Sequence, residues 1–271
     1  MNVVKFSWLI FTIFLVIEVV PAQSQVAGIQ TFSLNSKYLK EERLINVSLP
    51  KHFKSGSKDT FDVFYVLDGE WNTSLAEILC EFLGFAKFIP SNTIVVSVPN
   101  QYKDSVNMRD RDFTPTRTNY SSISGGADHF LLFLKNELVP FVNKKFLTRI
   151  DNSTLYGSSL GGLFAIYAYL NEPGLFKSYL TVEPSLWWDE GLLSKIESKK
   201  LRGISEMKNT LWIASRNGEA LKEMGIAQFD SLLNVSAPKG LRWKVEGYPN
   251  ETHFSTIWKG IYDGLRFIYQ K

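Results

Sequence analysis

The architecture of this chain is signalled by Ser153-Thr-Leu-Tyr-Gly157-Ser-Ser159-Leu-Gly161-Gly-Leu-Phe-Ala-Ile-Tyr-Ala-Tyr169. Thr154–Tyr156 predicts a short buried strand, and Leu163–Tyr169 predicts a helix that is packed on most faces. Between them, Gly157 to Gly161 matches the G-x-S-x-G pattern of a nucleophile elbow, in which a serine sits on a sharp strand-to-helix turn. The sequence therefore predicts Ser159 as a nucleophile.

The glycines around Ser159 have a steric explanation. A serine on such a turn has a strained backbone, and the residues two positions away must be small so that strand and helix can pass closely. The turn raises the hydroxyl above the sheet and puts the Leu160 N–H at a helix start, where it can stabilise an oxyanion. A glycine-rich turn that merely joins strand to helix is the alternative, and the strand and helix on either side favour the elbow.

Elements on both sides of the elbow alternate between strand and helix. The chain opens with an antiparallel pair within Thr31–Pro50, which has one wet face. Predicted strands then cover Phe61–Leu67, Thr93–Pro99, Tyr179–Val182, Thr210–Ser215 and Arg242–Gly247. Predicted helices cover Thr73–Phe85, Ala127–Phe146 with a kink or break at Pro140, Leu192–Glu197, Leu221–Leu233 and Phe254–Tyr269. This order predicts an α/β fold with a mostly parallel central sheet, N-terminal antiparallel strands and helices on both faces.

Composition limits the classes of function. The chain has 271 residues, 45% hydrophobic and 21% charged, which suits one large globular domain. The net charge of +3 is too small to indicate nucleic acid or an anionic membrane surface as a partner. Cys80 is the only cysteine, so no intrachain disulfide can form, and its helical apolar setting predicts an inert buried thiol.

The N-terminus predicts export. Lys5 lies in a short positive region, Phe6–Val20 is nearly all apolar, and Val20-Pro-Ala22 supplies the small residues of a signal-peptidase site. We expect a signal peptide at 1–22 and a single catalytic domain at 23–271. An uncleaved anchor is the alternative, but the apolar run is short for a spanning helix. The mature protein is expected to be periplasmic or secreted, without stable membrane insertion.

A serine hydroxyl needs a base, and imidazole has a suitable pKa. Three histidines are available. His52 follows the antiparallel pair, and His129 falls inside a helical pattern. His253 follows the last predicted strand on a loop at the same end of the sheet as Ser159, so we predict His253 as the base.

A carboxylate between Ser159 and His253 should orient the imidazole, in the chain order Ser, acid, His. Glu219 lies just past the strand that ends at Ser215 and is preferred. Glu183, directly after the strand that ends at Val182, is the second candidate. The predicted catalytic set is therefore Ser159, His253 and Glu219, with Glu183 left open.

A second oxyanion N–H should come from the loop that follows Leu67. Glu70 or Trp71 is the expected donor, and Gly69 provides the tight turn. The predicted oxyanion and substrate-binding residues are thus Leu160, Gly69, Glu70 and Trp71. Asp68 is interpreted as a structural turn former.

Several blocks resemble one known family. They are Tyr65-Val-Leu-Asp-Gly69, Arg109-Asp-Arg-Asp-Phe-Thr-Pro115, Gly125-Gly-Ala-Asp-His-Phe130, Gly157–Gly162, Pro184-Ser-Leu-Trp-Trp188 and His253. From about Thr31 to the C-terminus the chain resembles the "putative esterase" family of α/β-hydrolases, which includes esterase D, feruloyl esterases, mycolyltransferases and siderophore trilactone esterases.

The resemblance implies an α/β-hydrolase fold, no metal or other cofactor, and Ser159 and His253 as catalytic residues. Some members manage with a Ser–His pair, so the acid stays open. Glu183 stands where relatives often carry serine. Arg109 or Arg111 is a candidate contact for an anionic substrate, although their segment is more typical of wall and loop structure.

These observations predict an exported serine esterase that hydrolyses a carboxylic ester through an acyl-enzyme. Small-molecule esters, such as a siderophore or lipid ester, and polysaccharide-linked feruloyl or acetyl esters all fit. An acyltransferase of the same fold and a non-catalytic binding protein are the alternatives. Retention of both Ser159 and His253 argues against the binding protein.

Overall fold

An eight-stranded sheet runs through the protein, as seen in a computed structural model that describes residues 28–53, 59–201, 204 and 206–270. In sheet order the strands are β1 (Ile29–Ser36), β2 (Glu41–Ser48), β4 (Thr93–Val98), β3 (Phe61–Leu67), β7 (Thr148–Ser158), β8 (Ser178–Val182), β9 (Thr210–Arg216) and β10 (Arg242–Tyr248).

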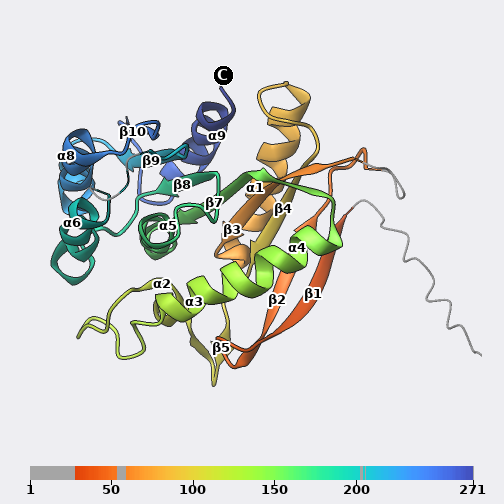
Figure 1. Cartoon of the computed structure of the whole chain (residues 1–271), viewed down its shortest axis with the longest axis horizontal. Helices are drawn as coiled ribbons and strands as arrows, with labels where there is room; N and C mark the ends of the chain where they lie inside the picture. The colour runs from red at the N-terminus through yellow and green to blue at the C-terminus, as the bar shows by residue number, and fades with distance from the viewer. Residues whose placement is uncertain (1–27, 54–58, 202–203, 205, 271) are drawn as a thin grey trace, which may run out of the picture.

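Strands β4 to β10 in this order pair in parallel, whereas β1–β2 and β2–β4 are antiparallel. Figure 1 shows β1 and β2 at one end of the sheet and β9 and β10 at the other. The predicted α/β fold, with a mostly parallel sheet and an N-terminal antiparallel pair, is confirmed.

The helices, in chain order, are α1 (Gly69–Phe85), α2 (Arg109–Phe113), α3 (Ala127–Phe133), the π-helical turn η1 (Leu134–Leu138), α4 (Val139–Lys145), α5 (Leu160–Asn171), α6 (Trp188–Leu201), α7 (Glu219–Glu223), α8 (Ile226–Ser236) and α9 (Thr256–Tyr269). Two further short strands, β5 (Tyr102–Lys103) and β6 (Val106–Asn107), form a small hairpin.

The central strand β3 is buried along its whole length because helices cover both faces of the sheet. Its side chains alternate between two cores. Tyr65 belongs to the core that includes Phe164 of α5, whereas Phe64 belongs to the core that includes Leu79 of α1 and Ile261 of α9. Burial on both sides explains why β3 is a continuous apolar run apart from Asp62.

The helix predicted over Ala127–Phe146 runs without a break as α3, η1 and α4 (Figure 1). Pro140 occupies the first turn of α4, directly after the π-helical turn. Because proline has no N–H, it cannot donate to the preceding turn, and the wider π turn accommodates this loss. The predicted kink or break at Pro140 is therefore replaced by a change of helix type.

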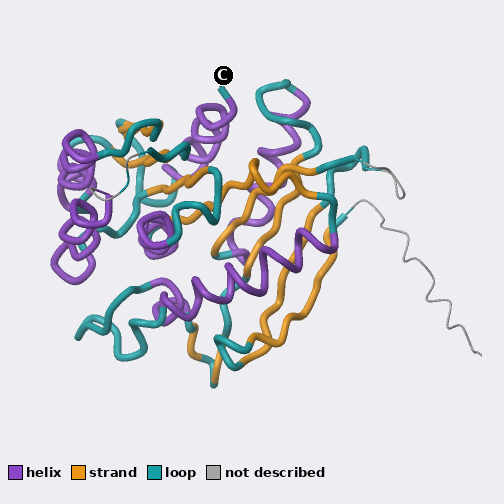
Figure 2. Tube along the Cα trace, viewed as in Figure 1, coloured by secondary structure: helices purple, strands orange, loops and turns teal. Residues whose placement is uncertain are grey.

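The segment between β4 and α3 is mostly loop (Figure 2). Its Tyr120 ring lies 5.4 Å from the ring of Trp187 and 5.7 Å from that of Trp188. Thr116 Oγ1 donates to Asp189 Oδ2 at 2.8 Å. The loop therefore packs against the segment that follows β8, close to the candidate site.

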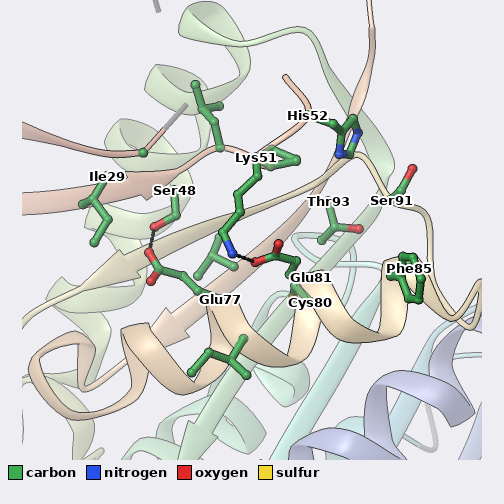
Figure 3. A pocket seen from close by; sticks show the side chains of 15 residues that line it. Ile29, Ser48, Lys51, His52, Glu77, Cys80, Glu81, Phe85, Ser91 and Thr93 are labelled. Carbon is green, nitrogen blue, oxygen red and sulfur yellow. Dashed lines mark hydrogen bonds and ion pairs between the residues drawn. The ribbon is translucent and has the colours of Figure 1, made fainter. Parts of the chain in front are cut away.

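A cavity of about 590 Å³ is lined by Ser48 at the end of β2 and the residues after it, by Thr93 and Val95 of β4, and by α1. Figure 3 shows α1 as one wall, with an ion pair of 2.6 Å between Lys51 and Glu81 and a hydrogen bond between Ser48 and Glu77. Cys80 also lines it. Burial, with a smaller effect of Glu77, raises the pKa of the Cys80 thiol to about 12, which agrees with the predicted inert thiol.

Within the described part of the chain, no helix has both the length and the apolar character needed to cross a bilayer. The predicted signal peptide, residues 1–22, lies outside the described residues.

Candidate active site

Ser159 lies between the end of β7 and the start of α5, with φ 54° and ψ −120°. This conformation is strained for any residue with a side chain. A Cβ on Gly157 would lie 2.1 Å from the carbonyl oxygen of Gly161, so the strand and the first helical turn touch at this point. The predicted steric basis of the elbow is confirmed.

His253 is oriented by Glu183. The imidazole Nδ1 lies 3.1 Å from Glu183 Oε2, and Glu183 is fully buried directly after β8. Because an ionised carboxylate accepts only, Nδ1 carries the proton and Nε2 presents its lone pair. His253 remains about one-third exposed, as a base that meets substrate must be.

The Glu183 carboxylate is held by donors from the end of β9. Ser215 Oγ donates to Oε1 at 2.8 Å, and the Arg216 backbone N–H donates to the same oxygen. Arg216 Nε donates to Oε2 at 2.9 Å. Burial alone would raise the pKa of the Glu183 carboxyl, but hydrogen bonds from His253, Arg216 and Ser215 outweigh it and lower the pKa to about 2. Glu183 is therefore a carboxylate throughout the physiological pH range.

Glu219, the preferred acid from the sequence, is not at His253. It begins α7 and is 79% exposed, and its carboxylate pairs with Lys222 at 3.2 Å. Two residues separate it from the end of β9, and Gly218 (φ 71°) turns the chain outward there. The structure thus replaces Glu219 with the second sequence candidate, Glu183.

Ser159 Oγ forms a hydrogen bond of 3.3 Å with Ser185 Oγ. The backbone supports this contact, because Ser185 N–H donates to the Ser159 carbonyl at 3.1 Å and Ser159 N–H donates to Val182 O at 3.0 Å. Among the described residues, no hydrogen bond joins Ser159 to His253. Such bonds often tighten only when substrate is bound.

Of the two N–H donors predicted after β3, only that of Glu70 remains available, and the N–H of Gly69, predicted as the turn residue, joins it as a candidate. The N–H of Trp71 donates to Asp68 O at 3.0 Å, because α1 begins at Gly69 and Trp71 already lies in its first turn. This rules out the Trp71 N–H as a free donor and leaves Gly69 and Glu70. Leu160 is the first residue of α5, where N–H groups lack intrahelical partners.

Asp68 is more than a turn former. It has φ 54° at the end of β3, as a turn requires, but its buried carboxylate also pairs with Arg109 at 2.6 Å. Arg111 pairs with Glu41 at 2.5 Å and with Asp112 at 2.7 Å. Both guanidinium groups are thus paired within the fold, and contact of either with an anionic substrate stays a prediction.

Ser185 and Arg216 were not predicted as site residues. Ser185 belongs to the Pro184–Trp188 block, which could have indicated it, but nothing local points its hydroxyl at Ser159. Arg216 ends a strand beside Glu183, and this pairing depends on the parallel register of β8 and β9. Among the described residues, no cluster of three or more His, Cys, Asp or Glu side chains could hold a metal ion.

Comparison with known proteins places these residues in a family. The model of the family described as "Putative esterase" matches residues 36–260, which include Ser159, Glu183 and His253. The chain belongs to this esterase family. The crystal structure of an IroE-like serine hydrolase from Shewanella oneidensis is 31% identical, with a TM-score of 0.79 over 90% of this chain and 80% of that chain.

Two curated relatives of this chain are named as esterases. The siderophore triacetylfusarinine C esterase of Aspergillus fumigatus is 30% identical over 162 residues, 56% of this chain and 56% of the relative. The ferri-bacillibactin esterase BesA of Bacillus subtilis is 32% identical over 149 residues, 53% of this chain and 52% of the relative. The chain thus spans about half the length of the curated relatives it matches.

Proposed function

We propose that this protein is a serine esterase that hydrolyses a carboxylic ester through an acyl-enzyme. The observation that carries the proposal is the contact of His253 Nδ1 with the buried Glu183 carboxylate, at a strand end next to the one that carries Ser159. A histidine held in this tautomer is ready to accept a proton at Nε2.

In the proposed reaction, Ser159 Oγ leaves its contact with Ser185, passes its proton to His253 Nε2 and attacks the ester carbonyl. The oxyanion is stabilised by the N–H of Leu160 and by that of Gly69 or Glu70. The tetrahedral intermediate collapses as the C–O bond to the alcohol breaks, and His253 returns the proton to that oxygen. Water then attacks the acyl-enzyme with His253 as base, which releases the acid and restores Ser159.

The first test is covalent labelling. Wild type should react with a fluorophosphonate probe and gain the mass of one adduct, whereas Ser159→Ala should not, because the probe bonds to the activated serine oxygen. His253→Ala should label at least about 100-fold more slowly. Intact-protein mass spectrometry measures both. A wild type that does not label, or a Ser159→Ala variant that does, would refute the proposal.

We further propose a siderophore ester as the substrate. The support is the Aspergillus fumigatus relative, a siderophore esterase that is 30% identical to this chain over 162 residues. The elbow and His253 also fall within the matched family region. Liquid chromatography with mass detection should show conversion of a hydroxamate or catecholate siderophore ester to its hydroxy acids, with Ser159→Ala as the blank. If the enzyme hydrolyses p-nitrophenyl acetate but leaves siderophore esters of both classes intact, the proposed esterase activity stands and the siderophore substrate is rejected.

Export is proposed from residues 1–22 alone. N-terminal sequencing of protein recovered from the medium or periplasm should begin near Gln23 or Gln25. Recovery of chains that still begin at Met1 in the cytoplasm would contradict it.

A further inference from the structure

One guanidinium at the candidate site keeps hydrogen-bond donors free. Arg216, the last residue of β9, donates from Nε to Glu183 Oε2 at 2.9 Å, and its backbone N–H donates to Glu183 Oε1. Among the described residues, neither Nη group of Arg216 has a hydrogen-bond partner, and neither is buried. The Nε side of this cation is thus used within the fold, whereas the Nη side faces solvent with its donors unpaired.

These free donors lie beside the proposed base. Arg216 Nε and His253 Nδ1 contact the same atom, Glu183 Oε2, at 2.9 Å and 3.1 Å. The two side chains are therefore neighbours across one carboxylate oxygen, and they are exposed to a similar extent, 31% for Arg216 and 33% for His253. Both open to solvent at the carboxyl edge of the parallel sheet, where a substrate would approach.

The guanidinium is held in place before any ligand arrives. Arg216 belongs to a strand that pairs in parallel with β8 on one side and with β10 on the other, where Tyr248 is its register partner. Its backbone and its side chain are both anchored to Glu183. A donor fixed in this way loses little conformational freedom when it binds a ligand.

Carboxylates on the neighbouring segments have lysine partners of their own. Glu246 of β10 pairs with Lys244 at 2.5 Å, and Glu219 at the start of α7 pairs with Lys222 at 3.2 Å. Within the described part of the chain, Glu183 is the only carboxylate that forms an ion pair with Arg216. The Nη end of the guanidinium is therefore left for a group that the protein itself does not supply.

We infer that Arg216 is a substrate-binding residue: its Nη groups bind an anionic oxygen group, such as a carboxylate, on the acyl or the alcohol part of the ester. This inference rests on the proposed esterase function. Guanidinium forms strong, charge-assisted hydrogen bonds to such groups, often two at once. Arg216 then has two functions, because its Nε holds Glu183 while its Nη groups favour anionic esters over neutral esters of similar shape.

The experiment compares kcat/KM within two pairs of esters. In the acyl pair, mono-p-nitrophenyl adipate carries a terminal carboxylate that p-nitrophenyl hexanoate lacks. In the alcohol pair, 4-acetoxybenzoate carries a carboxylate on its leaving group that phenyl acetate lacks. Arg216→Gln should lower the anionic-to-neutral ratio of kcat/KM about 10-fold in at least one pair, and the pair affected tells which part of the ester carries the anion. In wild type the same ratio should fall as NaCl is raised from about 0.05 to about 0.5 M.

Ser215→Ala is the matched control. Ser215 Oγ also donates to the Glu183 carboxylate, at 2.8 Å, but it carries no charge. Each of the two variants removes a donor from Glu183 and should lower the activity on all four esters. Because each ratio is measured within one protein, this common loss and any unfolded fraction cancel. Ser215→Ala should therefore keep both ratios within about twofold of wild type.

Failures of the two proposals are distinguishable. An active wild type whose Arg216→Gln variant keeps both ratios within twofold would overturn the role of Arg216 in binding and leave the esterase standing. Equal shifts of the ratio in Arg216→Gln and Ser215→Ala would likewise reduce Arg216 to a residue that only holds Glu183. A wild type that neither reacts with the fluorophosphonate probe nor hydrolyses any of the four esters would overturn both proposals.

Discussion

Three residues of the candidate site have a positive φ, and each directly follows a strand of the sheet. Asp68, Ser159 and Glu183 have φ values of 54°, 54° and 48°, and they follow the neighbouring strands β3, β7 and β8. Each such conformation costs roughly 1–3 kcal/mol in a residue that is not glycine. Hydrogen bonds hold each of the three: Arg109 to Asp68, Ser185 to Ser159, and Ser215 with Arg216 to Glu183. Strain at three adjacent strand ends is thus concentrated where the chemistry is proposed.

The depressed pKa of Glu183 predicts a specific loss of stability in acid. The folded pKa is about 2, below its ordinary value of 4.5. The carboxylate therefore contributes stability above about pH 4.5, and this contribution disappears as the pH falls from 4.5 through 2. By linkage it amounts to on the order of 3 kcal/mol, and Glu183 is buried enough for solvent screening to matter little.

Urea unfolding of wild type and Glu183→Gln at several pH values measures this contribution. The stability advantage of wild type should have its full value at pH 6 and should shrink steadily below pH 4.5. Groups that titrate elsewhere in the chain affect both proteins and cancel in the difference. An advantage that stays constant down to pH 2.5 would mean that Glu183 is not the acid-sensitive group described here.

The junction between β7 and α5 depends on a missing side chain. A Cβ on Gly157 would lie 2.1 Å from the Gly161 carbonyl oxygen, closer than any real contact allows, so strand and helix must move apart if one is added. We expect Gly157→Ala to destabilise the protein by about 1–3 kcal/mol. It should also lower fluorophosphonate labelling by at least about 100-fold, because the serine leaves its strained position.

Gly174→Ala serves as the control, because a Cβ there would meet no atom within 4 Å. Melting curves and labelling rates for the two variants give the comparison. If Gly157→Ala labels as fast as Gly174→Ala, close packing at the elbow does not position the nucleophile.

The sequence predicts the strand boundaries well because buried parallel strands are continuous apolar runs. Thr93–Pro99 and Phe61–Leu67 correspond closely to β4 and β3. The sequence predicts helix starts less accurately, because α1 begins at Gly69, four residues before the predicted start at Thr73. The first turn of α1 lacks the apolar periodicity on which that prediction relied, and its residues contact the ends of β3 and β4 instead.

Chain order and sheet topology together explain which parts of the site were predictable. In a parallel sheet all carboxyl ends share one edge, so Ser159 and His253 could be brought together from their places after strands. The same rule fits Glu183 and Glu219 equally well, because β8 and β9 end side by side. Glu183 differs from Glu219 in its burial and in its hydrogen-bond donors, Ser215 and Arg216. Both features depend on the long-range register of the strands. The pairing of Arg109 with Asp68, 41 residues apart, lies beyond local pattern for the same reason.

A comparison of Glu183→Gln with Glu219→Gln tests the proposed triad of Ser159, His253 and Glu183. Both are isosteric changes at carboxylates that follow neighbouring strands, but only Glu183 contacts His253. We expect kcat/KM for p-nitrophenyl acetate at pH 7.5 to fall by about 10³- to 10⁴-fold in Glu183→Gln, because the imidazole loses its tautomer and its stabilising charge. Glu219→Gln should stay within about twofold of wild type. A Glu183→Gln variant that is as active as wild type, or a Glu219→Gln variant that loses activity instead, would contradict this account.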